Sequence, residues 1–152
     1  MRLIFFVIYL SLYSTSLFAE LIKPNPDIKP VDVIKIQLTS LMKNNDPYLN
    51  AGIEQTWEFA HPSNRVFTGP IQKFTQMMYA PSYAVMLNHL KHDIIDVKLD
   101  NNSAFFFIEL TSEDGRMYGF KWTLKIVKID GPYKNCWMTT SVSTPMPLST
   151  DS

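Results

Sequence analysis

Residues 95–126, IDVKLDNNSAFFFIELTSEDGRMYGFKWTLKI, decide the fold of this chain. Apolar and polar residues alternate through much of this stretch, and turn-forming residues interrupt the alternation at 100–102 and at 114–115. Successive side chains of a β-strand point to opposite faces, so the pattern predicts three strands joined by two hairpins. A fourth strand is expected at 136–142, beyond a Gly-Pro turn at 131–132.

The residues before this stretch have helical spacing. Apolar side chains recur every three or four positions over 31–41, and Gln37 is placed with the lysines on the surface of that helix. Asn50 is a suitable N-cap for a second helix, which Pro62 is expected to end. A third helix is expected within 69–81, after a Gly-Pro pair and before another proline.

Three helices followed by four strands predict an α+β fold. The N-terminal helices are expected to pack on the apolar face of a curved four-stranded antiparallel sheet, in a single domain over 31–144. Residues 20–30 contain three prolines and are expected to form an extended lead-in. The Pro/Ser/Thr-rich residues 145–152 are expected to be a disordered tail.

The second predicted strand is apolar on both faces. Phe105 and Phe107 point away from Phe106 and Ile108, whereas a sheet covered on one side only should alternate. Either long side chains shield the outer face, or that face meets a second copy of the chain. A homodimer through the outer sheet face is therefore a hypothesis.

The first nineteen residues have the pattern of a secretory signal. Arg2 precedes an almost wholly apolar run from Leu3 to Leu12, and cleavage is expected between Ala19 and Glu20. The run is shorter than the roughly 20 residues that a transmembrane helix needs, so no stable membrane span is expected after cleavage. The sequence thus predicts an exported protein, periplasmic or secreted, with a retained membrane anchor as the alternative.

Charge and cysteine content restrict the partners. Fourteen basic and fourteen acidic residues balance without a basic patch, so nucleic acid is not an expected partner. Cys136 is the only cysteine, which excludes an internal disulfide and suggests a small buried residue in a strand. The sequence has no Gly-rich phosphate loop and no serine-hydrolase elbow, and no cofactor is predicted.

Several short motifs together resemble a known family. They are Gln37-Leu38, Asn45-Asp46, Gly52-Ile53, Phe59-Ala60, Pro62, Asn64-Arg65, Thr68-Gly69-Pro70, Phe74, Pro81, Tyr83, Asn88-His89 and Cys136-Trp137-Met138-Thr139. On these residues the chain resembles the bacterial and plant family called domain of unknown function 4864, which is similar to the nuclear-transport-factor-2-like superfamily. The resemblance implies a helix-lined cone around a curved sheet, and it implies no activity. The chain departs from the family pattern at His61, where a small residue is expected.

Glu54, Glu58 and His61 follow one another at i, i+4 and i+7, on one side of the second predicted helix. Two carboxylates and an imidazole could perform acid–base chemistry if they lined a cavity. The alternative is a solvated helix face that ends in a histidine capping the last carbonyls.

His89, His92, Asp93 and Asp96 have the spacing of a metal site on a helix. The segment is expected to enter a strand, however, where His89 and His92 would face opposite ways. No metal site is therefore predicted.

Asn64 and Arg65 are expected in the turn after the second helix. Asn64 suits a left-handed backbone position. Arg65 is a candidate to bind an anion beside the N-terminus of the third helix, with a role in the turn as the alternative.

Aromatic side chains with one polar edge are the best candidates to line a cavity. The complete candidate pocket consists of Trp57, Glu58, His61, Arg65, Tyr79, Tyr83, Trp122 and Trp137. The predicted function is binding of a small molecule or a protein partner without catalysis. One alternative is a cofactor-independent lyase or isomerase that uses Glu58, His61 or Tyr83, and another is an envelope interaction module that uses the outer sheet face.

Overall fold

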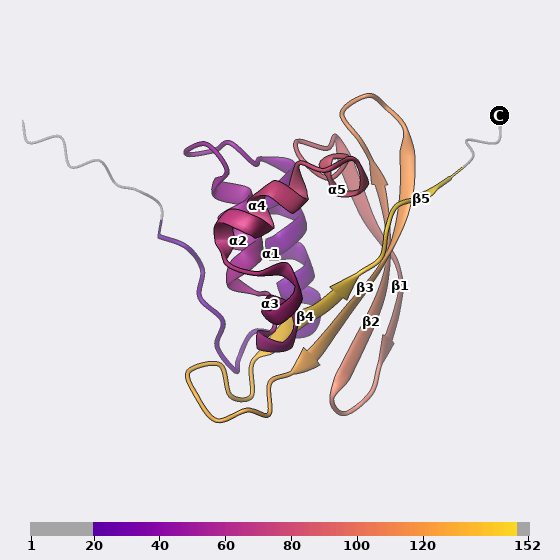
Figure 1. Ribbon diagram of the computed structural model, residues 1–152. Coiled ribbons are helices and arrows are strands. Elements are labelled where there is room, and N and C mark those ends of the chain that lie inside the picture. The colour runs from indigo at the N-terminus through magenta and orange to yellow at the C-terminus, as the bar shows by residue number, and fades with distance from the viewer. Residues whose placement is uncertain (1–19, 149–152) are drawn as a thin grey trace, which may run out of the picture.

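The predicted hairpins form the centre of the sheet. The computed structural model describes residues 20–148, and its first three strands are β1 (Lys91–Leu99), β2 (Ser103–Thr111) and β3 (Met117–Ile126). β4 (Trp137–Val142) follows, and neighbours are antiparallel in the order β1-β2-β3-β4. The helices gather on one face of this sheet (Figure 1), which confirms the α+β prediction.

A fifth strand, β5 (Met146–Pro147), corrects the prediction of a four-stranded sheet with a disordered tail from residue 145. β4 pairs with residues 122–126 of β3, and β5 pairs with residues 118–119 of the same strand. The composition of the tail favours coil, but the part of β3 beyond β4 offers backbone groups that need partners. The tail supplies them.

Within residues 20–148, five helices precede the sheet: α1 (Pro30–Met42), α2 (Ala51–Glu58), α3 (Pro62–Thr68), α4 (Ile71–Met78) and α5 (Pro81–Ala84). As predicted, α2 ends before Pro62 and α4 ends before Pro81, and each proline also starts the next helix. At that position the missing N–H costs nothing and the fixed φ angle suits a helix. The predicted turn after α2 is therefore α3, and Asn64 is helical rather than left-handed.

The core lies between the helices and the inner face of the sheet. α1 contributes Val33, Ile34, Leu38 and Leu41, and the sheet contributes alternate residues, among them Ala104, Phe106, Ile108, Leu110, Phe120, Trp122 and Leu124. The alternation in β2 and β3 follows the predicted period of two. Burial of these side chains is the main term that stabilises the fold.

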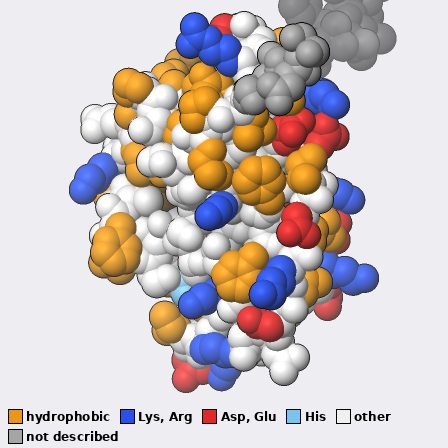
Figure 2. Space-filling view, turned by 90° about the vertical axis from the view of Figure 1, so that its right-hand side faces the viewer, with side chains coloured by type: hydrophobic (Ala, Val, Ile, Leu, Met, Phe, Trp, Pro, Cys, Tyr) orange, Lys and Arg blue, Asp and Glu red, His pale blue; other side chains and the backbone are white. Residues whose placement is uncertain are grey.

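The outer face of β2 is partly covered by the chain itself. A methyl group on Gly119 would lie 2.6 Å from Cζ of Phe107 and 3.5 Å from Cδ2 of Leu148, so the Phe107 ring packs over the bare glycine backbone. Phe105 remains 43% exposed. Figure 2, which views the molecule from the right-hand side of Figure 1, shows hydrophobic side chains interspersed with charged ones. Packing against the chain itself explains the apolar Phe107 on this face, and the homodimer through this face remains a prediction.

The predicted secretory signal, residues 1–19, lies outside the described residues, as does Ala19 of the expected cleavage site. Glu20, the other residue of that site, is exposed. No helix within residues 20–148 combines the length and the apolar character needed to cross a bilayer.

Candidate ligand cavity

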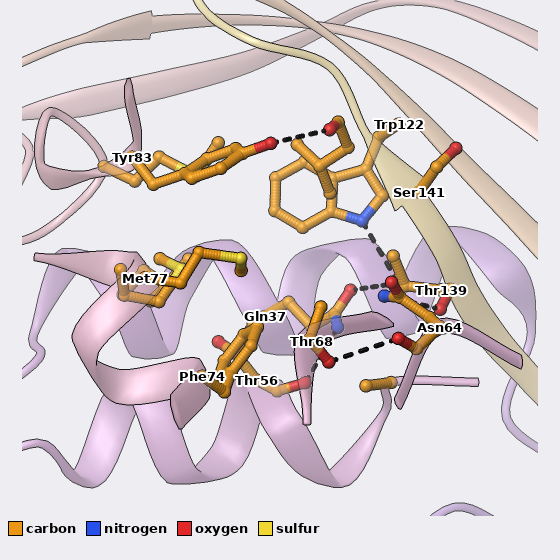
Figure 3. A pocket seen from close by; sticks show the side chains of 15 residues that line it. Gln37, Thr56, Asn64, Thr68, Phe74, Met77, Tyr83, Trp122, Thr139 and Ser141 are labelled. Atoms are coloured by element: carbon orange, nitrogen blue, oxygen red, sulfur yellow. Dashed lines mark hydrogen bonds between the residues drawn. The ribbon is translucent and has the colours of Figure 1, made fainter. Parts of the chain in front are cut away.

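A cavity of about 150 Å³ lies between the helices and the β4 side of the sheet (Figure 3). Its floor is buried, and its mouth is formed by partly exposed residues of α3, α4, α5 and β4. The lining consists of Gln37, Leu41, Thr56, Ala60, Asn64, Thr68, Phe74, Met77, Met78, Tyr83, Met86, Trp122, Thr139, Ser141 and Val142.

A chain of hydrogen bonds crosses the floor of the cavity. Nε1 of Trp122 donates to Oγ1 of Thr139 at 3.1 Å, and that hydroxyl donates to Oε1 of Gln37 at 2.7 Å. Nε2 of Gln37 then donates to the Thr56 carbonyl at 3.0 Å. All three side chains are buried, so the chain satisfies polar groups that water does not reach and fixes their orientation.

The Thr56 hydroxyl differs from this chain. Thr56 is 5% exposed and lines the cavity, and its Oγ1 has no hydrogen-bond partner among the described residues. A buried hydroxyl without a partner costs about 1–3 kcal/mol. The hydroxyl oxygen is buried within the wall of the cavity, so it is a polar group that the fold itself leaves unsatisfied.

The lining is electrically neutral. Among the described residues that line the cavity, Tyr83 carries the only titratable side chain, and its hydroxyl donates to the Val142 carbonyl at 3.2 Å. At the mouth, Nδ2 of Asn64 donates to the Thr139 carbonyl at 3.4 Å. Apolar and aromatic atoms with a few neutral polar groups are typical of a binding pocket for an uncharged molecule.

Gln37 is the principal residue that sequence reasoning misplaced. It is 1% exposed and therefore buried, contrary to the prediction that it lies on the surface of α1. A signal was present, because Gln37 lies three positions after Ile34 and four before Leu41, within the buried stripe of the helix. Its polar side chain concealed that position.

The structure brings only two of the eight predicted pocket residues, Tyr83 and Trp122, into the cavity. Tyr79 is half-exposed, and its hydroxyl donates to Oδ1 of Asn50 at 2.5 Å. Trp137, at the start of β4, packs against the hydrophobic core without lining the cavity. The other four lie around the end of α2 and are Trp57, Glu58, His61 and Arg65.

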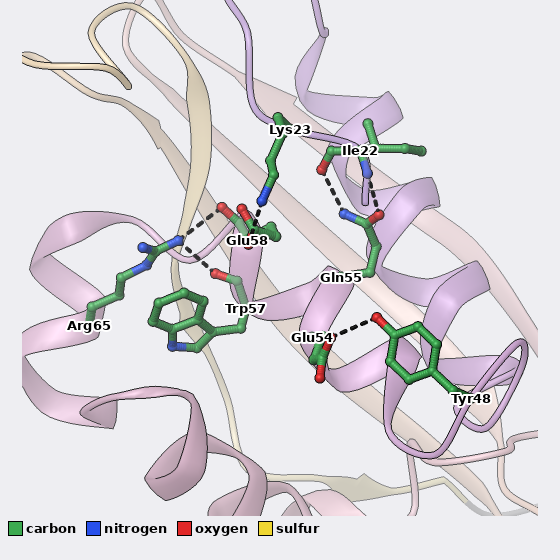
Figure 4. Close-up of polar contacts among 8 residues, drawn as sticks. All are labelled: Ile22, Lys23, Tyr48, Glu54, Gln55, Trp57, Glu58 and Arg65. Atoms are coloured by element: carbon green, nitrogen blue, oxygen red, sulfur yellow. Dashed lines mark hydrogen bonds and ion pairs between the residues drawn. The ribbon is translucent and has the colours of Figure 1, made fainter. Parts of the chain in front are cut away.

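Arg65 caps the end of α2 (Figure 4). One guanidinium nitrogen, Nη2, donates to the carbonyls of Trp57 at 2.9 Å and Glu58 at 3.1 Å. The guanidinium carbon lies 3.8 Å from the centroid of the Trp57 ring, a cation–π contact. Arg65 thus adds a charged donor to the last carbonyls of α2, of which that of Trp57 also accepts from the Ala60 amide, and Trp57 packs beneath Arg65 rather than in the cavity.

Glu54 and Glu58, the two carboxylates considered for acid–base chemistry, each bind a different partner. Oε2 of Glu54 accepts from the Tyr48 hydroxyl at 2.7 Å, and this bond is the main reason that the pKa of Tyr48 is raised to about 12. Glu58 pairs with Lys23 of the lead-in at 2.9 Å (Figure 4). Neither carboxylate lines the cavity.

His61 is the N-cap of α3. Its Nδ1 accepts from the Ser63 amide at 3.1 Å, and the ring is 8% exposed. Burial, and secondarily the charge of Lys125, lowers the pKa of His61 below its ordinary value. The expectation that this histidine caps the last carbonyls of α2 is wrong, because an unprotonated ring nitrogen accepts a hydrogen bond and so suits the amides at a helix start.

His89 and His92 are in contact, contrary to the expectation that they face opposite ways. β1 begins at Lys91, so His89 precedes the strand, and its Nε2 lies 2.7 Å from Nδ1 of His92. Within residues 20–148, no group of three or more His, Cys, Asp or Glu side chains is placed to hold a metal ion.

Comparison of the chain with family models, with curated proteins and with solved structures finds no match.

Proposed function

We propose that this chain binds a small, uncharged, largely apolar molecule in the cavity between the helices and β4, without catalysing a reaction. The observation that carries the proposal is a cavity between helices and sheet whose lining is largely apolar and, among the described residues, uncharged. The polar group of a ligand would bond with a neutral polar side chain at the mouth, such as Asn64 or Ser141, and its remaining atoms would contact Phe74, Met78 and Met86.

The size of the cavity restricts the ligand further. A volume of about 150 Å³ is comparable to that of an apolar cavity that accepts benzene. The ligand class that fits is therefore a single aromatic ring or a short aliphatic chain with one hydroxyl or carbonyl group. Phenol is a suitable probe, and toluene is its counterpart without the hydroxyl.

Binding is favoured over lyase or isomerase chemistry by the places of the candidate acids and bases. Glu58 is engaged with Lys23, and His61 with Ser63. Tyr83 reaches the cavity without a second titratable group among the described lining residues. Acid–base catalysis of an isomerisation needs two such groups in one pocket.

We also propose a fold family and a compartment for this chain. Helices that precede a twisted sheet and enclose a cavity with it support a cone of the nuclear-transport-factor-2-like type, as the resemblance implies. The apolar run after Arg2 supports export to the periplasm or the medium.

Phenol should bind to the wild-type protein with a Kd on the order of 1 mM, as measured by ligand-observed NMR. Thr68→Trp places a large ring at the mouth of the cavity and should weaken binding at least about tenfold. Val66→Trp on the same helix is the matched control, because Val66 is 79% exposed and does not line the cavity. Equal phenol binding by both variants would rule out this site.

Thr56→Val should raise the free energy of unfolding by about 1 kcal/mol, because it removes a buried hydroxyl that has no partner. The same change should leave phenol and toluene binding unchanged, because the hydroxyl oxygen has no surface in the cavity. Urea denaturation and NMR titration measure the two effects. A destabilised variant would show that the hydroxyl has a partner in the fold.

A further inference from the structure

β1 leaves one edge of the sheet open. Within residues 20–148, no strand pairs with the side of β1 that faces away from β2. The Asp100 amide donates toward β2, to the Ser103 carbonyl at 2.9 Å, and amide direction alternates along a strand. The amides of Val97 and Leu99 therefore point to the open edge, and the Val97 amide instead donates to Oδ1 of the adjacent Asp96 at 2.9 Å.

The open edge also carries apolar side chains that the helices do not cover. Val97 pairs with Phe106 and Leu99 with Ala104, so both side chains lie on the inner face of the sheet. They are nevertheless 42% and 60% exposed, and Ile95 in the adjacent bulge is 55% exposed. An exposed edge of this kind is a template for a further strand.

We propose that the open edge of β1 pairs with the same edge of a second copy of this chain, antiparallel, about a two-fold axis at Val97. In this register Val97 faces Val97 of the partner subunit, and Ile95 faces Leu99 of the partner subunit. The Val97 amides and carbonyls of the two protomers then form a mutual pair of hydrogen bonds. The two five-residue segments thus place apolar residues opposite apolar residues.

Charge complementarity identifies a second copy as the occupant. Asp96 pairs with Phe107 and Lys98 with Phe105, so both charged side chains lie on the outer face of the sheet. In the proposed register, Asp96 of each protomer faces Lys98 of the partner subunit. A register shifted by two residues would lose this match of opposite charges. The two-fold pairing is self-complementary, as the interface of a symmetric dimer must be.

A ladder of five residues from each protomer is shorter than a standard protein interface, so the dimer is weak and reversible. The contact is also distinct from a dimer through the outer sheet face, because it uses the backbone edge rather than the exposed Phe105 ring. Asp96 exchanges its bond to the Val97 amide for one to the partner's lysine, which leaves the pairing of β1 with β2 intact.

Charge-reversal variants test the pairing. Their association is measured by sedimentation equilibrium at protein concentrations up to about 500 µM. Asp96→Lys places two basic side chains at positions 96 and 98, and Lys98→Asp places two acidic ones, so each variant alone repels itself across the axis. Each should weaken dimerisation about 30-fold relative to wild type. An equimolar mixture of the two variants should dimerise again, because every charge then faces its opposite.

Both positions are exposed, and circular dichroism should show unchanged folding in each variant. Phe105→Ser should leave the dimer in place. A wild-type protein that is monomeric at about 500 µM would overturn the proposal. So would a dimer that survives both single reversals, or one that Phe105→Ser abolishes.

Discussion

Gly52→Ala should lower the free energy of unfolding by more than about 4 kcal/mol and leave much of the protein unfolded at room temperature. α2 crosses α1 at this glycine, where the two backbones touch. A Cβ at Gly52 would lie 2.1 Å from the carbonyl oxygen of Ser40 and 2.9 Å from Cα of Asn44. Both contacts are with backbone, so no rotation of a side chain can relieve them. The Gly52 amide also donates to the Asn44 carbonyl at 3.0 Å, which ties the start of α2 to the turn after α1.

Gly115→Ala is the matched control. Gly115 has a φ angle of 84° and no heavy atom within 4 Å of an added Cβ. The substitution should therefore lower the free energy of unfolding by only about 1–2 kcal/mol, through backbone strain. Urea denaturation followed by circular dichroism measures both variants. A Gly52→Ala variant as stable as Gly115→Ala would mean that α1 and α2 do not approach as described.

Lowering the pH from 6.5 to 4 should remove about 3 kcal/mol of stability through His89 alone. Burial, partly offset by the bond to the Met86 carbonyl, lowers the pKa of His89 from 6.5 to about 4. The folded state thus favours the neutral ring. The contribution of this ring is complete above pH 6.5, where the unfolded chain is also neutral, and is lost as the pH falls toward 4.

Hydrogen-bond geometry explains why a second proton is unfavourable. Nδ1 of His89 lies 2.7 Å from the Met86 carbonyl and must donate to it, so the Nε2 atom of the neutral ring accepts. Nδ1 of His92 therefore donates to His89 across 2.7 Å. Protonation of His89 would place a charge in a site where His89 is 2% exposed, and would require His92 to move its proton from Nδ1 to Nε2 to avoid opposing two N–H groups.

The difference in stability between wild type and His89→Gln isolates this effect. Glutamine stays neutral at every pH, while His61 and His92, whose pKa values burial also lowers, and the carboxylates titrate in both proteins. The difference should change by about 3 kcal/mol between pH 7 and pH 4 when urea denaturation is repeated along the pH series. Parallel pH profiles would contradict the burial of His89 as a neutral acceptor.

The sheet could be predicted because its signal is local. Alternation within β2 and β3, with Asp114-Gly115 between them, specifies both the strands and their hairpin. The helix boundaries were harder, since a proline is compatible with the end of one helix and the start of the next. Pro62 serves the second purpose, and its neighbour His61 supplies the cap.

The cavity could not be predicted, because its parts are distant in the sequence. The bond between Gln37 and Thr139 joins residues 102 positions apart, and neither belongs to a motif with a known chemical role. Aromatic content identified Tyr83 and Trp122 correctly. It also selected Trp57 and Tyr79, because an aromatic side chain in sequence does not reveal whether it faces a cavity, the core or an arginine.

Methyl NMR of the methionines during a phenol titration locates the binding site directly. Met77, Met78 and Met86 line the cavity, whereas Met138 is buried in a separate cluster with Val127. Phenol in the cavity should shift the methyl signals of the three lining methionines and leave that of Met138 in place. Unchanged signals from those three at saturating phenol, or equal shifts of Met138, would contradict ligand binding in this cavity.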